Sequence, residues 1–485
     1  MRLILILFLV CCIPVSGRDT LRVTLPEAIA RARTRSVDAA VALNKLRSAY
    51  WEYRSYRADL LPEVNFTAKA PGYYKQYSSY QNADGSYGFV NNNYLNISGE
   101  LSVQQKLWFS GGTLSLNTSL DFYRQLSGNK YNRYMAIPVA LTLRQPVFGV
   151  NTVKWNRRIE PERYAEALAA FLSETEEVAM SAISNFFSLL LCRENVEISR
   201  QNLRNAEKLY EVAREKRSMG RISKNDLLQM ELNVLDARSA LTTRESDLKS
   251  AMFRLRSFLD YEDDVEIEPV LPGELPEVTI NYDDALDKAL ENNKFAKNIR
   301  RRQLEADYAV AQAKGNLRQI ELFAQIGYTG TGKQFRNAYD PLKDNQVVEV
   351  GFSVPLLDWG KRRGKVKVAQ SQRELTESQV RQEKQNFSQD LFVLVERFNN
   401  QQQQLEMAER ADTIARQRYD TNVETFMIGK ISTLDLNDSQ TTKDEMRQAL
   451  VNELYLLWRY YYEIRSITLW DYERGILLDA GIQDF

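Results

Sequence analysis

Histidine is absent from all 485 residues of the chain. Its absence excludes Ser-His-Asp and Cys-His catalysis, the usual zinc sites and the side chain that most often moves protons near neutral pH. The GxxxxGK[ST] pattern that cradles phosphates is missing as well. We therefore expect no catalytic residues, no metal site and no cofactor. A hydrolase built on two carboxylates survives these exclusions, although no segment gathers acidic residues in a way that indicates a cleft.

An excess of either charge is also missing, because 64 lysines and arginines balance 64 aspartates and glutamates. A nucleic-acid-binding protein usually carries a basic surplus, so we expect no nucleic acid partner. Long hydrophobic runs are equally scarce. Beyond the N-terminal segment, no stretch has enough consecutive apolar residues for a membrane-spanning helix.

The N-terminal segment has the composition of a secretory signal. Arg2 precedes an apolar run over residues 3–13, and the small residues Ser16 and Gly17 follow Pro14. The run is too short to remain in a bilayer as a helix, and the order of basic, apolar and small residues is that of a cleaved leader. We expect a signal peptide over 1–17 and export of the rest of the chain.

Cysteines are few, and their placement limits the covalent chemistry. Cleavage after Gly17 leaves Cys192 as the one cysteine of the mature chain, so no intramolecular disulfide can form. Lipidation of Cys11 or Cys12 is the alternative to this cleavage. It is disfavoured because Val10 or Cys11 would then stand where a small residue is expected.

One block of sequence occurs twice. Residues 210–241 and 419–450 align without a gap, and each contains a glycine, a basic residue, Ile-Ser and then Asp-Leu. An insertion would rotate every later side chain off its helix face, so the ungapped register indicates two copies of one helix–turn–helix. The turn residues are Gly220, Arg221, Ile222 and Ser223 in the first block and Gly429, Lys430, Ile431 and Ser432 in the second.

The duplication extends upstream, so each repeat reads as a helix, strands with period-two alternation and a long helical hairpin. Repeat 1 (18–259) is predicted to contain a helix over 25–60, strands over 64–148 and a hairpin over 151–259. Repeat 2 (281–465) is predicted to contain a helix over 283–317, strands over 320–356 and a hairpin over 360–465. An equatorial strand and linker are expected over 260–280, and an equatorial tail over 466–485. Because repeat 1 has the longer strand region, it must hold an extra hairpin, which turns at Gly111-Gly112.

The hairpin helices are unusually long. The outgoing helices over 151–218 and 360–427 contain no breaker except Pro161, and at about 1.5 Å per residue each makes a rod of roughly 100 Å. On the first returning helix Leu228, Leu232 and Leu235 recur at intervals of four and three, which is typical of a coiled-coil seam.

The signal segment, the repeated order of helix, strands and long hairpin, and the two Gly-basic-Ile-Ser-x-x-Asp-Leu turns resemble the TolC-type outer-membrane efflux proteins (outer membrane factors). The resemblance covers nearly the whole mature chain. It implies an α+β membrane protein: a homotrimer whose strands form one β-barrel in outer-membrane lipid, continued by a long antiparallel coiled-coil tunnel of α-helices in the periplasm. It also implies a passive exit duct of a tripartite efflux or type I secretion system, engaged by a periplasmic adaptor protein and an inner-membrane transporter.

The small number of strands in one chain indicates that several subunits share one barrel. A few strands cannot close a barrel around an aqueous lumen in one chain, and unpaired strand edges are not tolerated in lipid. Two strands in each repeat of three chains give 12 strands. We expect this number, with the hairpin over 101–122 as an elaboration; the barrel would have 18 strands if that hairpin joined the wall.

The resemblance also assigns roles to the hairpin turns. In the family, two acids on the second turn ring the periplasmic pore, and Asp435 and Asp438 match their positions. Asp226 matches a gating acid of the first turn, and Phe426 takes the place of a gate aromatic. The eight turn residues named above would form the surface where the adaptor docks. Ile431 departs from the pattern, because the best-known member carries a gate arginine there, and this argues against that salt-bridge latch.

Each proposed role has a simpler alternative. Ser223-x-x-Asp226 and Ser432-x-x-Asp435 are capping boxes, so these two aspartates have the alternative role of starting the returning helices. Asp438 lies beyond the cap and has no such role. For the whole chain, the main alternative is an exported coiled-coil scaffold without a pore, which would leave the alternating strands unexplained. The cargo is not indicated by any motif.

Overall fold

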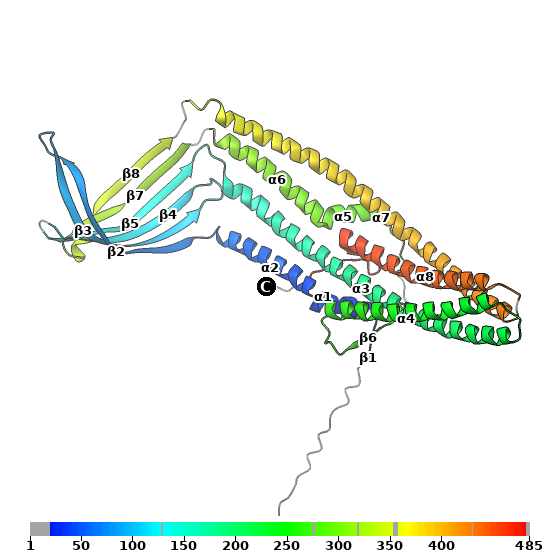
Figure 1. Cartoon of the computed structure of the whole chain (residues 1–485). Coiled ribbons are helices and arrows are strands. Elements are labelled where there is room, and N and C mark those ends of the chain that lie inside the picture. Colours follow the sequence, from blue (N-terminus) through cyan, green and yellow to red (C-terminus); the bar gives the residue numbers. More distant parts are fainter. Residues whose placement is uncertain are drawn as a thin grey trace, which may run out of the picture. The chain divides into compact units, whose positions relative to one another are not determined.

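The computed structural model describes residues 20–127, 130–273, 276, 278–317, 320–352, 357–428 and 430–481. The predicted signal peptide over 1–17, the last residues of the strand region over 320–356 and Gly429 lie outside this part. The chain divides into two compact units. The hairpin unit comprises Met1–Leu46, Leu168–Asn293 and Asn386–Asp484, and the sheet unit comprises Arg47–Ala167 and Lys294–Gln385 (Figure 1).

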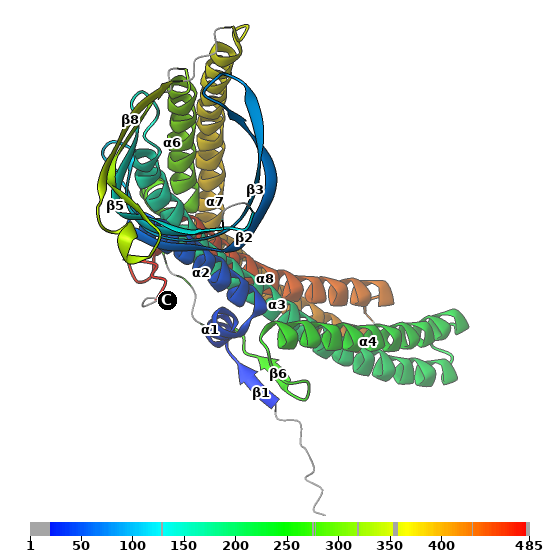
Figure 2. The same ribbon diagram turned by 90° about the vertical axis from the view of Figure 1, so that its left-hand side faces the viewer.

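The sheet unit is built on one antiparallel six-stranded sheet in the order β2-β3-β4-β5-β7-β8. Figure 2 shows that this sheet is strongly curved. Its strands are β2 (Glu63–Gln81), β3 (Tyr87–Lys106), β4 (Thr113–Gln125), β5 (Asn132–Pro146), β7 (Ile320–Gly332) and β8 (Lys343–Phe352). The short helix η1 (Arg336–Ala338) lies in the connection between β7 and β8.

The expectation that the hairpin over 101–122 is an elaboration is wrong. Leu101 on β3 pairs with Phe66 on β2 and with Thr118 on β4, and β4 continues the ladder to β5. Residues 18–259 therefore contribute four strands to the sheet, and residues 281–465 contribute two. The extra strands can join the ladder because their alternation of apolar and polar side chains matches that of the neighbouring strands. The pairing also satisfies the hydrogen-bonding groups of their backbones.

Four helical segments adjoin the sheet at one end, where β2 and β7 begin and β5 and β8 end. They belong to α2 (Val37–Ala58), α3 (Thr152–Ser218), α6 (Lys294–Gly315) and α7 (Lys361–Met427). Tyr53 of α2 stacks on Tyr164 of α3 with ring centroids 5.1 Å apart. Arg301 of α6 forms an ion pair with Glu166 of α3 at 2.6 Å, so neighbouring helices are linked by both stacking and charge.

The helices expected over 25–60 and 283–317 are each divided in two. Ser36 separates α1 (Leu25–Arg35) from α2, and Asn293 separates α5 (Tyr282–Asn292) from α6. Both residues have extended backbone angles and are buried. The Ser36 hydroxyl accepts a hydrogen bond from the backbone N–H of Ala39, and the Asn293 side chain donates to the carbonyl of Ile467. The Ser36 hydroxyl thus caps the start of α2, whereas the Asn293 side chain satisfies a carbonyl in the last turn of α8 (Thr433–Thr468).

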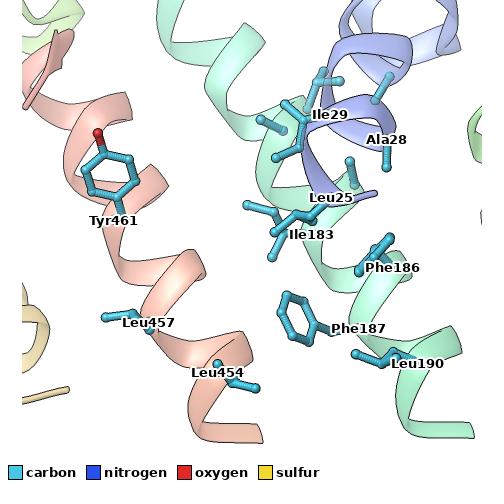
Figure 3. Packing of buried hydrophobic residues seen from close by; sticks show 14 of the residues in the cluster. Leu25, Ala28, Ile29, Ile183, Phe186, Phe187, Leu190, Leu454, Leu457 and Tyr461 are labelled. Atoms are coloured by element: carbon cyan, nitrogen blue, oxygen red, sulfur yellow. The ribbon is translucent and has the colours of Figure 1, made fainter. Parts of the chain in front are cut away.

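The hairpin unit has its core where α1, α3 and α8 (Thr433–Thr468) meet. Buried side chains of these helices, among them Leu25, Ile183, Phe186 and Leu457, converge on one cluster (Figure 3). The returning helix α4 (Lys224–Phe258) adds Leu255 to the same cluster. Burial of apolar side chains at this density supplies the main stabilising free energy of the unit.

Short strands complete the hairpin unit. The strand expected within 260–280 is β6 (Glu266–Pro269), and it pairs in parallel with β1 (Thr20–Val23). The tail after α8 forms the small pair β9 (Trp470–Asp471) and β10 (Ile476–Leu477). No helix in the described ranges combines the length and the apolar composition that crossing a membrane requires.

Candidate functional site

The two faces of the sheet differ in chemistry. Residues that pair across neighbouring strands share a face, and adjacent residues of one strand lie on opposite faces. One cross-strand row reads Val64, Val103, Leu116, Leu141, Ile326 and Gln346, and the next row, on the other face, reads Asn65, Ser102, Asn117, Ala140, Gly327 and Asn345. The sheet therefore has an apolar face and a polar face, and both extend across the extra strands β3 and β4.

The apolar face is exposed in the single chain. Val64, Leu116 and Ile326 have 63%, 45% and 55% of their surface accessible. Soluble monomers rarely expose apolar patches of this extent. Large aromatic side chains border the sheet near the end where the helices attach, and those that are exposed there include Trp108, Phe109, Phe148 and Trp359. Such a border is typical of strands that face lipid.

The first hairpin turn follows from local backbone chemistry. Gly220 has a φ of +70°, and the backbone N–H of Arg221 donates to the carbonyl of Lys216 at 2.9 Å. This is the Schellman ending of a helix, which glycine adopts without the Cβ strain of other residues. Ser223 then begins α4, because its hydroxyl accepts from the Asp226 N–H while the Asp226 carboxylate accepts from the Ser223 N–H.

The second turn repeats these contacts in the residues that the structure describes. The N–H of Lys430 donates to the carbonyl of Thr425 at 3.1 Å. The spacing between donor and acceptor is the same as between Arg221 and Lys216 in the first turn. Ser432 and Asp435 form the reciprocal capping box that begins α8, with N–H to oxygen distances of 3.1 and 3.2 Å. The capping role is therefore present in the geometry of both aspartates.

The same hydrogen bonds perturb the two capping carboxylates. Bonds from the Ser223 side chain and backbone lower the pKa of Asp226 below its usual value. Bonds from the Ser432 side chain and backbone lower the pKa of Asp435, and the nearby charge of Arg418 adds a smaller effect in the same direction. Hydrogen bonds to a carboxylate favour its ionised form, so both aspartates stay charged at neutral pH.

Asp438 has a different environment. Its carboxylate lies 2.6 Å from the guanidinium of Arg418, on the outgoing helix α7, and both side chains are about half exposed. The sequence reasoning missed Arg418. The available signal was its distance from the turn, because residues equally far from the turn of an antiparallel hairpin face each other. In the second hairpin the basic partner of Asp438 is therefore Arg418 of α7, and Ile431 does not take part in the ion pair.

The two turns enclose a cavity of about 510 Å³. Of the predicted site residues, Arg221, Ile222, Asp226, Phe426, Ile431 and Ser432 line it. Further lining residues that sequence reasoning did not identify are Leu209, Val212, Ala213, Lys216, Met230, Met427 and Ile428. Most of the lining residues are apolar, but Lys216, Arg221, Asp226 and Ser432 are polar. The Lys216 ammonium lies 5.7 Å from the ring centroid of Phe426. Gly220, Ser223, Lys430, Asp435 and Asp438 are not among the lining residues that the structure describes.

Candidate metal ligands do not gather in the described part of the chain. No group of three or more acidic or cysteine side chains there is placed to hold a metal ion. Cys192 is half-buried, and burial raises the pKa of its thiol, which reduces its reactivity.

The sequence profile of the family described as outer membrane efflux protein matches residues 28–259 and 286–467. The chain belongs to the outer membrane efflux protein family. This confirms the resemblance to TolC-type proteins, and the two matched segments flank the linker that follows β6. An outer membrane efflux protein is a channel of the outer membrane that serves transport, and the family is not a class of enzymes.

Solved structures of outer-membrane and transmembrane-channel proteins share this fold. CusC is 14% identical, with a TM-score of 0.63 and coverage of 92% of this chain and 91% of that chain. The CmeC outer membrane channel of Campylobacter jejuni is 13% identical, with a TM-score of 0.66 and coverage of 92% and 85%. VceC of Vibrio cholerae is 16% identical, with a TM-score of 0.62 and coverage of 94% and 97%. No curated protein sequence matches the chain significantly.

Proposed function

We propose that three copies of this efflux protein form a passive exit duct through the outer membrane, as part of a tripartite efflux or type I secretion system. The observation that carries the proposal is the amphipathic sheet. Among the described strands, β2 and β8 each have a neighbour on one side only. A sheet with an apolar outer face cannot keep free edges in lipid, so β8 of one copy would pair with β2 of the next until the barrel closes.

The hairpin unit offers a second surface for neighbouring copies. Leu228, Leu232 and Leu235 form the predicted seam of α4, and each exposes about half of its surface in the single chain. The same helix buries Leu255 in the core. The exposed part of the seam would pack against a hairpin of the adjacent copy, which completes a cylinder of helices in the periplasm. The shared order of helix, strands and hairpin in the two halves fits an origin by duplication.

The hairpin turns would engage a periplasmic adaptor protein. Most residues that line the cavity between them are apolar, and Lys216, Arg221 and Asp226 add charge to its wall, so it would suit an amphipathic helix of the partner. An inner-membrane transporter would supply the energy, since the chain carries no nucleotide-binding motif. At the same end, three copies of Asp435 and Asp438 would form two acidic rings about one helical turn apart.

The assembly can be tested on detergent-extracted protein. We expect a trimer by light scattering and native mass spectrometry, heat-modifiable migration, and single-channel currents in a planar bilayer. A coiled-coil scaffold without a pore would leave the envelope without detergent and give no currents. A monodisperse monomer in mild detergent would contradict the trimer.

Adaptor docking can be tested separately in cells. A photo-crosslinking amino acid at Ile222 should capture the adaptor, whereas the same group at Val368, which is 70% exposed on α7, is the matched control. Equal capture at both positions, or capture at Val368 alone, would show that the turns are not the docking surface.

A further inference from the structure

The extra hairpin of residues 18–259 has the surface of a membrane-facing wall. On β3 and β4, Leu101, Val103 and Leu116 share the apolar face, while Ser102 and Asn117 share the polar face. A hairpin that plugged a lumen would be polar on both faces, because water would surround it. The extra strands instead repeat the alternation of the strands on either side of them.

We propose that the barrel of this protein has eighteen strands, six from each chain, and that its lumen admits solutes too large for a twelve-stranded barrel. The inference rests on the proposed trimer, and it assigns the extra hairpin to the barrel wall. The chemical class of cargo that it favours is a bulky hydrophilic solute or an extended chain.

The shortest strand is long enough for this role. β8 has 10 residues. At about 3.4 Å per residue and a tilt of about 40°, it spans roughly 26 Å along the barrel axis, which matches the apolar band of outer-membrane barrels. The β8–β2 contact between copies can therefore run through the whole apolar layer.

The extra strands change the width substantially. With strands about 4.8 Å apart and tilted by about 40°, eighteen strands enclose a backbone circle of roughly 18 Å radius, and twelve enclose one of roughly 12 Å. A side-chain layer about 5 Å thick leaves free radii of roughly 13 Å and 7 Å. The open cross-section therefore differs by about threefold between the two barrels.

The first experiment asks whether the extra hairpin lies in the wall. Single cysteines at the adjacent positions Asn117 and Leu116 of β4 are introduced into a Cys192→Ala background, and intact cells are treated with a small membrane-impermeant maleimide. We expect labelling of Asn117→Cys and protection of Leu116→Cys. Labelling of both would place the hairpin inside the lumen and overturn the proposal.

A matched pair on β7 separates this outcome from failure of the proposed function. Gln325 and Ile326 are adjacent and lie on the polar and the apolar face of a strand that every barrel of this family would need. If Gln325→Cys is labelled and Ile326→Cys is protected, the protein is a membrane channel, irrespective of how the two cysteines on β4 are labelled. If neither pair shows the difference, the channel itself is wrong.

The second experiment measures the width. Maleimides on polyethylene glycols of graded size are applied from outside to Gln325→Cys in the full-length chain. Conductance is a poorer measure, because a constriction elsewhere would limit the current. We expect reagents of about 10 Å radius to react, whereas a cut-off near 7 Å would contradict the eighteen-stranded barrel.

A deletion variant supplies the control. Leu95 pairs with both Tyr73 on β2 and Arg124 on β4, and Arg124 pairs with Asn132 on β5. Removal of residues 74–124 therefore joins Tyr73 to Gln125 in register and keeps the native turn into β5. In the same assay this variant should exclude reagents that the full-length chain admits. An unchanged cut-off in a folded variant would refute the inference. If the variant does not fold, the labelling of Asn117→Cys and Leu116→Cys still shows whether the hairpin lies in the wall.

Discussion

Arg465 of α8 holds two buried carboxylates in the hairpin unit, and its removal should be costly. Its guanidinium donates to Glu176 at 3.2 Å and to Asp471 at 2.9 Å, and all three side chains are less than a tenth exposed. Burial alone would lower the pKa of Arg465, but the charge of Glu176 and the other acidic neighbours outweighs it, and the pKa is raised. The positive charge is therefore stabilised by the folded chain.

The cost of Arg465→Met follows from the partners that remain. Glu176 keeps the guanidinium of Arg33, and Asp471 keeps the hydroxyl of Tyr461. Breaking a buried ion pair costs about 3–5 kcal/mol, and the remaining partners place this variant near about 3 kcal/mol. For a folding unit of this size the loss corresponds to a fall in melting temperature of roughly 6–12 °C.

Thermal unfolding of the detergent-solubilised protein, followed by near-UV circular dichroism, measures the loss. Arg474→Met is the matched control, because Arg474 approaches the same Asp471 at only 4.0 Å and is 77% exposed. Its loss should be under about 1 kcal/mol.

The double variant Arg465→Met/Glu176→Gln decides whether charge is the cause. Removing one negative charge together with the positive one should recover more than half of the lost stability. If the double variant is no more stable than Arg465→Met alone, or if Arg474→Met is equally destabilised, the reasoning from buried charge is wrong.

Replacing Asp435 and Asp438 together with asparagine should weaken cation selectivity and block by multivalent cations while the trimer stays intact; unchanged reversal potentials and unchanged block in a planar bilayer would exclude the acidic rings. Ser432→Ala removes the cap of α8 and should cost about 1 kcal/mol, measured by amide exchange at the turn, without changing selectivity. The contribution of the Asp435 charge to the cap should be present above its unfolded pKa of about 4 and disappear as the pH falls through its lowered native pKa, which an acid titration of amide exchange at the turn checks. Gly220→Ala should destabilise the first turn by about 1–2 kcal/mol because its φ is positive, whereas Gly364→Ala, a helical glycine with equally open surroundings, should stabilise the chain; the same sign in both thermal melts would contradict this.

At the ends of the hairpins, some contacts follow from the local sequence and others do not. The capping boxes at Ser223 and Ser432 and the helix end at Gly220 were predictable because each is made by residues within six positions of each other. The pairing of Arg418 with Asp438 was not predicted, since it joins two helices across a turn. The cavity between the turns was equally hidden, because its walls come from α3, α4 and α7.

The strands show the same division at larger scale. The period-two alternation over 64–148 predicted strands, since side-chain direction depends only on the neighbouring residues. It did not predict whether the extra strands join the sheet, because any strand with this alternation can pair in several places. The breaks at Ser36 and Asn293 were missed because neither residue is a glycine or a proline. The Ser36 hydroxyl makes a local cap with the N–H of Ala39, whereas the contact of Asn293 with the Ile467 carbonyl joins segments far apart in the sequence.

By itself the sequence determined the long helices, the turns, the alternating strands and the family, because breakers, caps and side-chain periodicity act over a few residues. Only the tertiary structure decided that six strands form one sheet with edges at β2 and β8, that Arg465 gathers Glu176 and Asp471, and that two distant turns enclose one cavity. These features depend on segments far apart in the chain, and their pairing is selected by the burial and hydrogen bonding of the whole fold rather than by any local pattern.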